Sequence, residues 1–429
     1  MGSMQNKQHR LTSVLSIFAL VMLLGLTMML AGCMKDTQTD DENLKDEDTQ
    51  NSIVENQEPT NEEFSNDTQE NEPEPEETYI DIRIAAAGDI MVHSTQITSA
   101  YDDQTGTYNF KPMFEDVRPI LSEADLAIAN FETTTAGPSR EYAGYPAFNS
   151  PDEVIDAIKY AGIDVLTTAN NHSLDTGRDG LKRTVNTINE KGIDTVGTYA
   201  EVPDTRVLLK DVKGIKLAIL SYTESTNGIG DQYPPDELHA MLNMMEKDHI
   251  IRDIQSAKDL GADFIIAYMH WGTEYMEEPN EKQVEYAYMM AEEGVDLILG
   301  SHPHVIQRSE VIETAEQETF VIYSMGNFIS NQRMETLGED RQLTEDGVIV
   351  NIDIRKNEQT NETTIEHVEY VPTWVYRHKF EGDSKYTYRI LPIEQFLLSD
   401  EISEAYKQRM QRSLDATVSK MYQSPAWSQ

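Results

Sequence analysis

The chain has 429 residues and a formal net charge of −42 at pH 7. This length suffices for one large domain with appendages, and the acidity argues against nucleic acid as a partner, because phosphate binding needs clusters of Lys and Arg. The single cysteine, Cys33, excludes an intrachain disulfide and leaves the body of the chain without a thiolate nucleophile or ligand.

The N-terminal segment predicts export from the cytoplasm. Lys7 and Arg10 precede the apolar run 11–30, and the letters "LAGC" end at Cys33. A basic stretch, an apolar stretch and small residues before the cut are typical of a signal peptide. The site resembles a lipobox, so we expect a lipoprotein signal peptide over 1–33 and a lipid anchor on the extracytoplasmic face of the membrane. The alternative is a single uncleaved transmembrane helix, because about 20 apolar residues can span a bilayer.

Residues 34–78 predict a disordered acidic linker. Between residues 36 and 78 the chain carries 17 Asp or Glu and one Lys. Such a segment cannot bury enough apolar surface to offset the entropy of ordering it, and its like charges repel one another.

The body of the chain alternates strands and helices. Four times a helical pattern is followed by a glycine, an aspartate and an apolar run, which predicts a left-handed helix cap before a buried strand. The expected helices cover 152–160, 181–191, 248–260 and 281–293, and further strands are expected at 81–89, 124–132 and 215–223. After residue 334 the pattern predicts antiparallel strands at 347–357 and 365–378 and a closing helix at 400–421. The fold class is therefore α/β with a largely parallel core.

Polar side chains gather where the expected strands end. In parallel sheets, ligands bind in the crevice at the carboxyl ends of the strands, and we expect these residues at that edge of one sheet. They are Asp89, His93, Asn130, Glu132, Asn171, His172, Asp175, His270, His302 and His304.

The last two of these residues flank Pro303. In an extended segment their side chains would point to the same side of the chain. The alternative is a strand end that is only solvated by water.

The donors in this group are nitrogen and oxygen without sulfur, which suits Zn, Mn or Fe. There are more of them than one tetrahedral ion needs, so the set predicts two divalent ions bridged by a carboxylate.

Six short motifs follow one another between residues 81 and 329: "GDIMVH", "ANFE", "NNHSLDTG", "HWGTEY", "GSHPHVIQ" and "YSMGNF". In this order they resemble the calcineurin-like metallophosphoesterases and, among them, the CapA group of poly-γ-glutamate capsule biosynthesis proteins. The resemblance implies a four-layer α/β/β/α sandwich over 79–334, which the C-terminal strands and helix of 335–429 complete.

The resemblance also implies roles for individual residues. One metal would be held by Asp89 and His304, the other by Asn171, His270 and His302, with Glu132 as the bridge. His172 would stabilise or protonate the leaving oxygen; alternatively it is a structural histidine. Asp175 would orient it or, equally, cap the next helix.

Two features depart from the pattern of the classical phosphoesterases. Met91 fills a histidine position, so that the nearest imidazole is His93, either a ligand or a loop residue, and the bridge Glu132 replaces an aspartate. Both features put classical phosphatase activity in doubt.

The family resemblance implies a cell-surface component of poly-γ-glutamate capsule synthesis or export, with membrane-embedded synthase subunits as partners. Three alternatives use the same ligands. The protein could be an extracytoplasmic phosphoesterase, a γ-glutamyl amide hydrolase or transferase acting on the anionic polymer, or an assembly subunit without catalysis. The sequence leaves enzymatic activity open.

Overall fold

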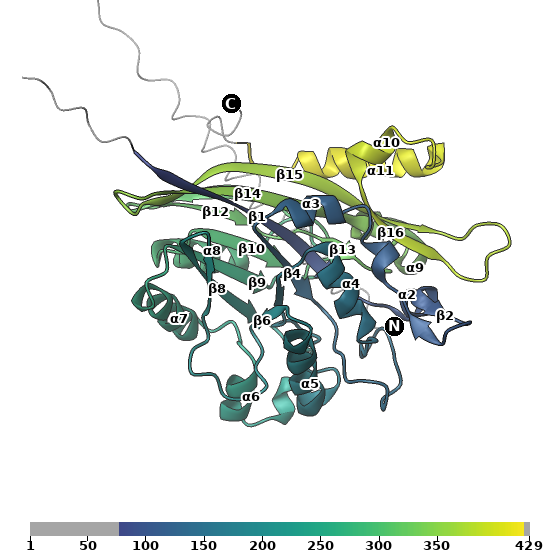
Figure 1. Cartoon of the computed structure of the whole chain (residues 1–429), viewed down its shortest axis with the longest axis horizontal. Coiled ribbons are helices and arrows are strands. Elements are labelled where there is room, and N and C mark those ends of the chain that lie inside the picture. Colours follow the sequence, from purple (N-terminus) through teal and green to yellow (C-terminus); the bar gives the residue numbers. More distant parts are fainter. Residues whose placement is uncertain (1–76, 424–429) are drawn as a thin grey trace, which may run out of the picture. The chain divides into compact units, whose positions relative to one another are not determined.

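The computed structural model describes residues 77–423, and the predicted signal peptide and nearly all of the predicted linker lie outside them. In this part of the chain two β-sheets are the main elements (Figure 1). The first sheet contains, in order, β16 (Thr387–Pro392), β15 (Thr363–His378), β14 (Asp346–Asn357), β1 (Tyr79–Ile90), β4 (Leu126–Phe131), β5 (Val165–Thr167) and β6 (Asp194–Val196), with β13 (Asn327–Ile329) also paired to β1. The second contains β11 (Ser309–Glu313), β12 (Glu318–Ile322), β10 (Leu297–Ser301), β9 (Phe264–His270), β8 (Ile215–Thr223) and β7 (Leu208–Val212).

The two sheets pack face to face through one apolar core. Successive side chains of a strand point to opposite faces, and β1 follows this rule. Ile82, Ile84 and Ala86 join the core shared with β8, β9 and β10, whereas Ala85 and Ala87 join a second core with the helices. The inner faces of both sheets are therefore buried against each other.

Helices cover the two outer faces. On the first sheet lie α3 (Arg118–Glu123), α4 (Glu153–Ala161) and α5 (Gly177–Glu190), and on the second lie α7 (Lys247–Asp259) and α8 (Glu281–Glu292). These four layers confirm the predicted α/β/β/α sandwich. Shorter elements are α2 (Ser94–Ala100), α6 (Pro235–Met241), α9 (Met334–Leu337), the 3₁₀ turns Lys111–Met113, Gly230–Gln232 and Glu339–Glu345, and the hairpin of β2 (Tyr101–Asp102) and β3 (Thr107–Tyr108).

The four predicted helix–glycine–aspartate units are α4, α5, α7 and α8 with the strands that follow them. The glycine after each helix has φ between 74° and 99°, a left-handed conformation that a residue with a Cβ rarely adopts.

Aspartates at the strand starts tie each strand to its neighbour. Asp164 Oδ2 accepts the Ala127 N–H at 2.9 Å, and Asp296 Oδ2 accepts the Ile265 N–H at 2.7 Å. In the same way, Asp263 Oδ2 accepts the Lys216 N–H at 2.8 Å. Three of the four recurring aspartates thus hold the register of the parallel strands at their amino ends, and the fourth, Asp194, instead accepts from Lys210 Nζ.

The C-terminal part extends the first sheet. The strands predicted at 347–357 and 365–378 are β14 and β15, and β16 was not predicted. The predicted closing helix is α11 (Glu404–Val418), which packs with α10 (Ile393–Leu397) over β15 (Figure 1).

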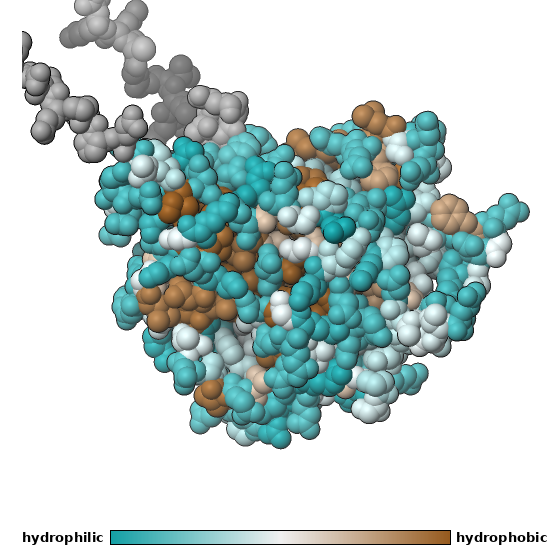
Figure 2. Space-filling view, in the orientation of Figure 1, coloured by the Kyte–Doolittle hydropathy of each residue, from teal (hydrophilic) through white to brown (hydrophobic). Residues whose placement is uncertain are grey.

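The face of the molecule in Figure 2 is mostly hydrophilic, with apolar side chains exposed in small groups. Among residues 77–423, no helix has the length and apolar character needed to cross a membrane.

Candidate metal centre

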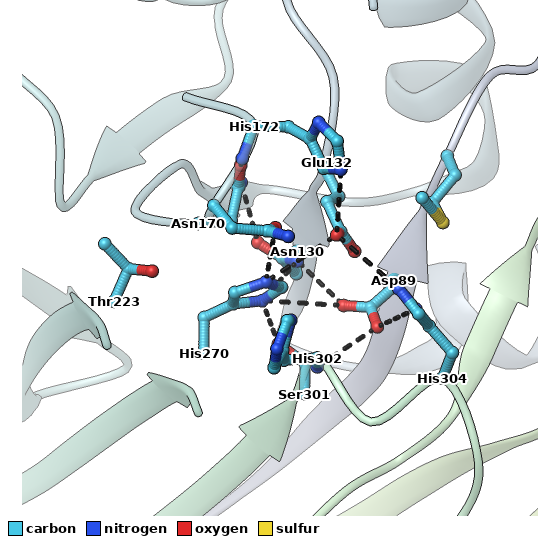
Figure 3. Close-up of polar contacts among 12 residues, drawn as sticks. Asp89, Asn130, Glu132, Asn170, His172, Thr223, His270, Ser301, His302 and His304 are labelled. Carbon is cyan, nitrogen blue, oxygen red and sulfur yellow. Dashed lines mark hydrogen bonds and ion pairs between the residues drawn. The ribbon is translucent and has the colours of Figure 1, made fainter. Parts of the chain in front are cut away.

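The predicted metal-binding residues lie together at the ends of five strands, which come from both sheets (Figure 3). Asp89 ends β1, Glu132 follows β4, and His270 ends β9. Asn171 and His172 follow β5, and His302 and His304 follow β10. The expectation of one sheet is therefore wrong. The chain passes from the first sheet to the second between β6 and β8, where the antiparallel pair of β7 and β8 takes the place of a strand–helix unit.

Glu132 lies at the middle of the site. Its Oε1 lies 3.6 Å from His270 Nε2, 3.9 Å from His304 Nε2 and 4.0 Å from His172 Nε2. The side chain is completely buried, and neither carboxylate oxygen has a hydrogen-bond partner among residues 77–423. Burial, and next the charge of Asp89, raise the pKa of Glu132 well above its ordinary value. A buried acceptor that faces three imidazoles in this way fits the place of a metal-bridging carboxylate.

Asp89 is also completely buried but has several polar partners. Asn130 Nδ2 donates to Oδ1 at 2.7 Å, the His302 N–H donates to Oδ2 at 3.2 Å, and His304 Nδ1 lies 3.3 Å from Oδ2. Burial alone would raise the pKa of Asp89, but the His304 hydrogen bond and the charges of His270 and His304 hold it below its ordinary value. This carboxylate is thus kept ionised and oriented, as a metal ligand must be.

His270 is held by one ring nitrogen and presents the other to the site. Its Nδ1 lies 2.9 Å from Ser301 Oγ, and its Nε2 lies 3.0 Å from Asn171 Oδ1. Burial, and next the charge of His302, lower the pKa of His270 well below its ordinary value. A neutral imidazole with a fixed ring orientation is the form that binds a metal, and the amide oxygen of Asn171 is close enough to bind the same ion.

At this site two groups of side chains have ligand atoms close enough to share one cation, and both contain Glu132. One group adds His302 and His304, and the other adds Asp89 and His270. The resemblance instead assigned Asp89 and His304 to one metal and His302 with His270 to the other. Asp89 also contacts His304, and the rings of His270 and His302 lie 4.7 Å apart, so the assignment from the resemblance stays a prediction. In both groupings Glu132 is the shared ligand.

The prediction that the segment of His302 and His304 is extended is wrong. His302 has φ 97° and His304 has φ 57°, so the chain turns twice through left-handed conformations. The two rings still lie 6.0 Å apart and both reach the site. Pro303 separates two unusual backbone conformations, which are typical of functional sites.

His172 forms a dyad with Asp175. Its Nδ1 lies 2.8 Å from Asp175 Oδ2, which also accepts the Phe148 N–H at 2.7 Å. Its Nε2 faces Glu132 Oε1. The N-cap residue of α5 is Thr176 and not Asp175, so the carboxylate of Asp175 is available to orient the imidazole.

The ring of Phe148 lies between His93 and His172 and contacts both imidazoles edge to face. His93 Nδ1 accepts the Asn331 N–H at 3.2 Å, and burial lowers the pKa of His93 to about 4. It belongs to neither group of potential ligands, and only its Nε2 remains available for a cation. Met91, at the position of the missing histidine, is buried.

Sequence reasoning missed Ser301, which fixes the ring of His270. The only indication of this role in the sequence is the position of Ser301 directly before His302. Arg178 pairs with Glu237, and Arg308 pairs with Glu278.

Comparisons with known proteins relate the chain to capsule synthesis proteins. The Haemophilus influenzae NAD nucleotidase structure aligns with a TM-score of 0.45 and 11% identity over 80% of this chain and 64% of that chain. The Bacillus anthracis protein "Capsule biosynthesis protein CapA" is 30% identical over 64% of this chain and 64% of its own length. The Bacillus subtilis "PGA biosynthesis protein CapA" is 30% identical over 66% of this chain and 70% of its own length. The family model "Bacterial capsule synthesis protein PGA_cap" matches residues 83–332. The chain therefore belongs to the PGA_cap family of bacterial capsule synthesis proteins.

Proposed function

We propose that this protein is a component of poly-γ-glutamate capsule synthesis or export that uses a dinuclear metal centre on the outer side of the cell membrane. The observation that carries the proposal is Glu132, a fully buried carboxylate without hydrogen-bond partners in the described chain, surrounded by imidazoles from two sheets. The CapA relatives support the assignment to capsule synthesis.

The donor set supports two divalent ions. Asp89, Asn171, His270, His302 and His304 would complete the coordination around Glu132, and these nitrogen and oxygen donors suit Mn, Zn or Fe. Bound ions of this kind supply a hydroxide at neutral pH and neutralise negative charge on the reacting group.

The dyad of His172 and Asp175 favours a hydrolase or transferase as a second candidate function. Asp175 fixes the Nδ1 side of the ring, so that Nε2 can hold or deliver a proton beside Glu132. That arrangement is suited to protonating a leaving oxygen or nitrogen. The substrate would be a phosphate ester or a γ-glutamyl amide of the anionic polymer.

The location is proposed from the sequence alone, because residues 1–33 lie outside the described part of the chain. Cleavage and lipidation at Cys33 would anchor the protein beside membrane-embedded synthase subunits. We expect Cys33→Ser to move the protein from the membrane fraction to the medium or to leave it as an unprocessed precursor, as seen by fractionation and mass spectrometry. A variant that stays in the membrane with its signal uncleaved, like the wild type, would support the single transmembrane helix instead.

The role in the capsule is tested in the source bacterium. Deletion of the gene is expected to abolish surface poly-γ-glutamate, measured by acid hydrolysis and chiral amino-acid analysis of released polymer. The wild-type gene should restore the polymer and Glu132→Ala should not. Unchanged polymer after deletion would overturn the capsule assignment.

The chemistry is tested with the full chain loaded with Mn, Zn or Fe. Turnover of aryl phosphate esters or γ-linked glutamate oligomers is expected, and His172→Asn should lower it by about 10²–10⁴-fold without loss of metal. If none of the three metal forms turns over either substrate class, the second candidate function is wrong, whereas the metal centre and capsule role are judged by their own experiments.

A further inference from the structure

A third group of potential metal ligands lies outside the metal centre. It consists of His239 on α6, Glu246 at the N-cap of α7, and His249 in the first turn of α7. We propose that these three side chains form a separate zinc site that joins α6 to α7. The site shares no residue with the metal centre and does not depend on the function proposed for it.

The geometry brings three donors together from two helices. His239 Nε2 lies 2.8 Å from Glu246 Oε1, and His249 Nδ1 lies 3.6 Å from Glu246 Oε2. The two rings stand edge to face with centroids 4.8 Å apart. One ligand atom from each residue lies within 4.8 Å of the others. Neighbouring ligands of a tetrahedral ion with bonds of about 2.0–2.2 Å lie about 3.3–3.6 Å apart. The separation of Glu246 and His249 matches this value, and the 2.8 Å hydrogen bond between His239 and Glu246 would lengthen when a cation enters.

The carboxylate of Glu246 is directed at the imidazoles and not at its own helix. Glu246 is the N-cap residue of α7, with extended φ and ψ, but its side chain makes no capping hydrogen bond. Asn280, the N-cap of α8, shows the usual alternative, because its side chain accepts the Gln283 N–H. At 3.6 Å, Glu246 and His249 are too far apart for a hydrogen bond, and a cation between them would satisfy both.

The surroundings suit a cation. Two imidazoles and one carboxylate leave a fourth position open for water, which is the ligand pattern of an accessible zinc site. All three side chains are partly exposed, so that zinc can enter from solvent. Arg206 lies beside the group but is bound to other acceptors, since it donates to the carbonyl of His239 and to Asn243. Asp253, one turn after His249 on α7, adds a negative charge that interacts with both His249 and Arg206.

A bound zinc would stabilise the segment that packs against the loop of Asn171 and His172. The segment between His239 and Glu246 carries Met241 and Leu242, which pack against Ala169 and Leu174 in one apolar cluster. That cluster contains residues on both sides of Asn171 and His172. Joining α6 to α7 would therefore stiffen the support of the loop that presents these two residues.

The test compares the zinc content of full-length variants at two partly buried histidines, His249 and His367. Protein stripped by chelator is titrated with zinc, separated from free zinc and analysed for zinc per chain. We expect His249→Ala to bind one zinc fewer than the wild type, while the control His367→Ala, from the partly buried His367 on β15, binds as many as the wild type. Glu246→Gln, which keeps the shape of the side chain, should also lose one zinc. Melting curves in chelator verify that each variant is folded.

Equal zinc content in His249→Ala, Glu246→Gln and the wild type would overturn the proposal and leave an ordinary cluster of imidazoles and a carboxylate. The result is independent of the metal centre, because loss of ions there follows changes at Glu132, His302 or His304 and not at His249. A cobalt titration gives a second readout. The wild type should show an additional visible absorption of tetrahedral cobalt that His249→Ala lacks, and identical spectra would also contradict the site.

Discussion

The two ends of the same parallel strands differ in how their polar groups are satisfied. At the starts, Asp164 and Asp296 each accept a backbone N–H of the neighbouring strand. At the carboxyl ends, both oxygens of Glu132 and the Nδ1 of His302 have no hydrogen-bond partner in residues 77–423. The two aspartates therefore have partners within the chain, whereas the carboxylate of Glu132 has none among the described residues.

This difference has an energetic meaning. A buried polar group without a partner costs about 1–3 kcal/mol, and more when it is charged. The chain bears that cost at the end where Glu132 meets three imidazoles and avoids it at the other end. If only the stability of the fold mattered, polar groups at both ends of the strands would be expected to have hydrogen-bond partners. The unpaired groups at the carboxyl ends therefore indicate a binding site.

The largest effect is expected from the shared ligand. Glu132→Ala should remove both ions, since a bridge serves two cations and its loss leaves them facing each other unshielded. Metal per chain by elemental analysis measures the loss. Glu132→Gln has nearly the same volume, so a similar loss in both variants assigns the effect to charge and not to packing. Full retention of metal in Glu132→Ala would contradict the bridging role.

Single ligand changes should have about half that effect. His302→Ala and His304→Ala are each expected to lose about one ion and to melt at a lower temperature, because metal bound only to the native state adds to the free energy of folding. The matched control is His367→Ala on β15, which should keep the metal content of the wild type. Equal metal content in all three variants would show that the two histidines are not ligands.

At the strand starts a change should alter stability without altering metal content. Burial raises the pKa of Asp296 to about 7 from 3.8. As the pH rises from about 4 to 7, the unfolded chain loses this proton before the folded chain does, so stability falls by at most about 1.4 kcal/mol per pH unit. Asp296→Asn should lack this part of the slope in urea unfolding between pH 4 and pH 7. Identical slopes for variant and wild type would exclude the raised pKa.

The smallest effect is expected for Asp164→Ala. It leaves the Ala127 N–H without its acceptor and should lower the free energy of unfolding by about 1–2 kcal/mol. Asp164→Asn retains an acceptor oxygen and should lose less. Both variants should keep the metal content of the wild type, and a loss of metal from either would break the distinction between the two ends.

The regular part of the fold could be predicted from the sequence because it obeys local rules. The helix–glycine–aspartate units at Gly162 and Gly294 combine a periodic apolar pattern with a left-handed cap, and both signals are local. Asp89, Glu132 and His270 could be found because each lies at or directly after the end of an apolar strand.

What the sequence could not predict depends on contacts between distant segments. The apolar strands themselves do not show the division into two sheets, because β8 and β9 have the same pattern as β4 and β5. The change is marked only by β7 and β8, an antiparallel pair that follows β6 without a helix. The left-handed backbone at His302 and His304 is imposed by the site, against the preference of both residues. The role of Ser301 depends on His270, a residue of another strand.

The most direct test of the dinuclear centre is the difference in metal content between the wild type and His302→Ala/His304→Ala. Both full-length proteins are expressed with Mn, Zn and Fe in the medium and analysed for metal per chain, beside melting curves with and without chelator. We expect the wild type to carry about two more divalent ions than the double variant and to lose thermal stability on chelation. Equal metal content, with melting unaffected by chelator, would contradict the two-metal centre.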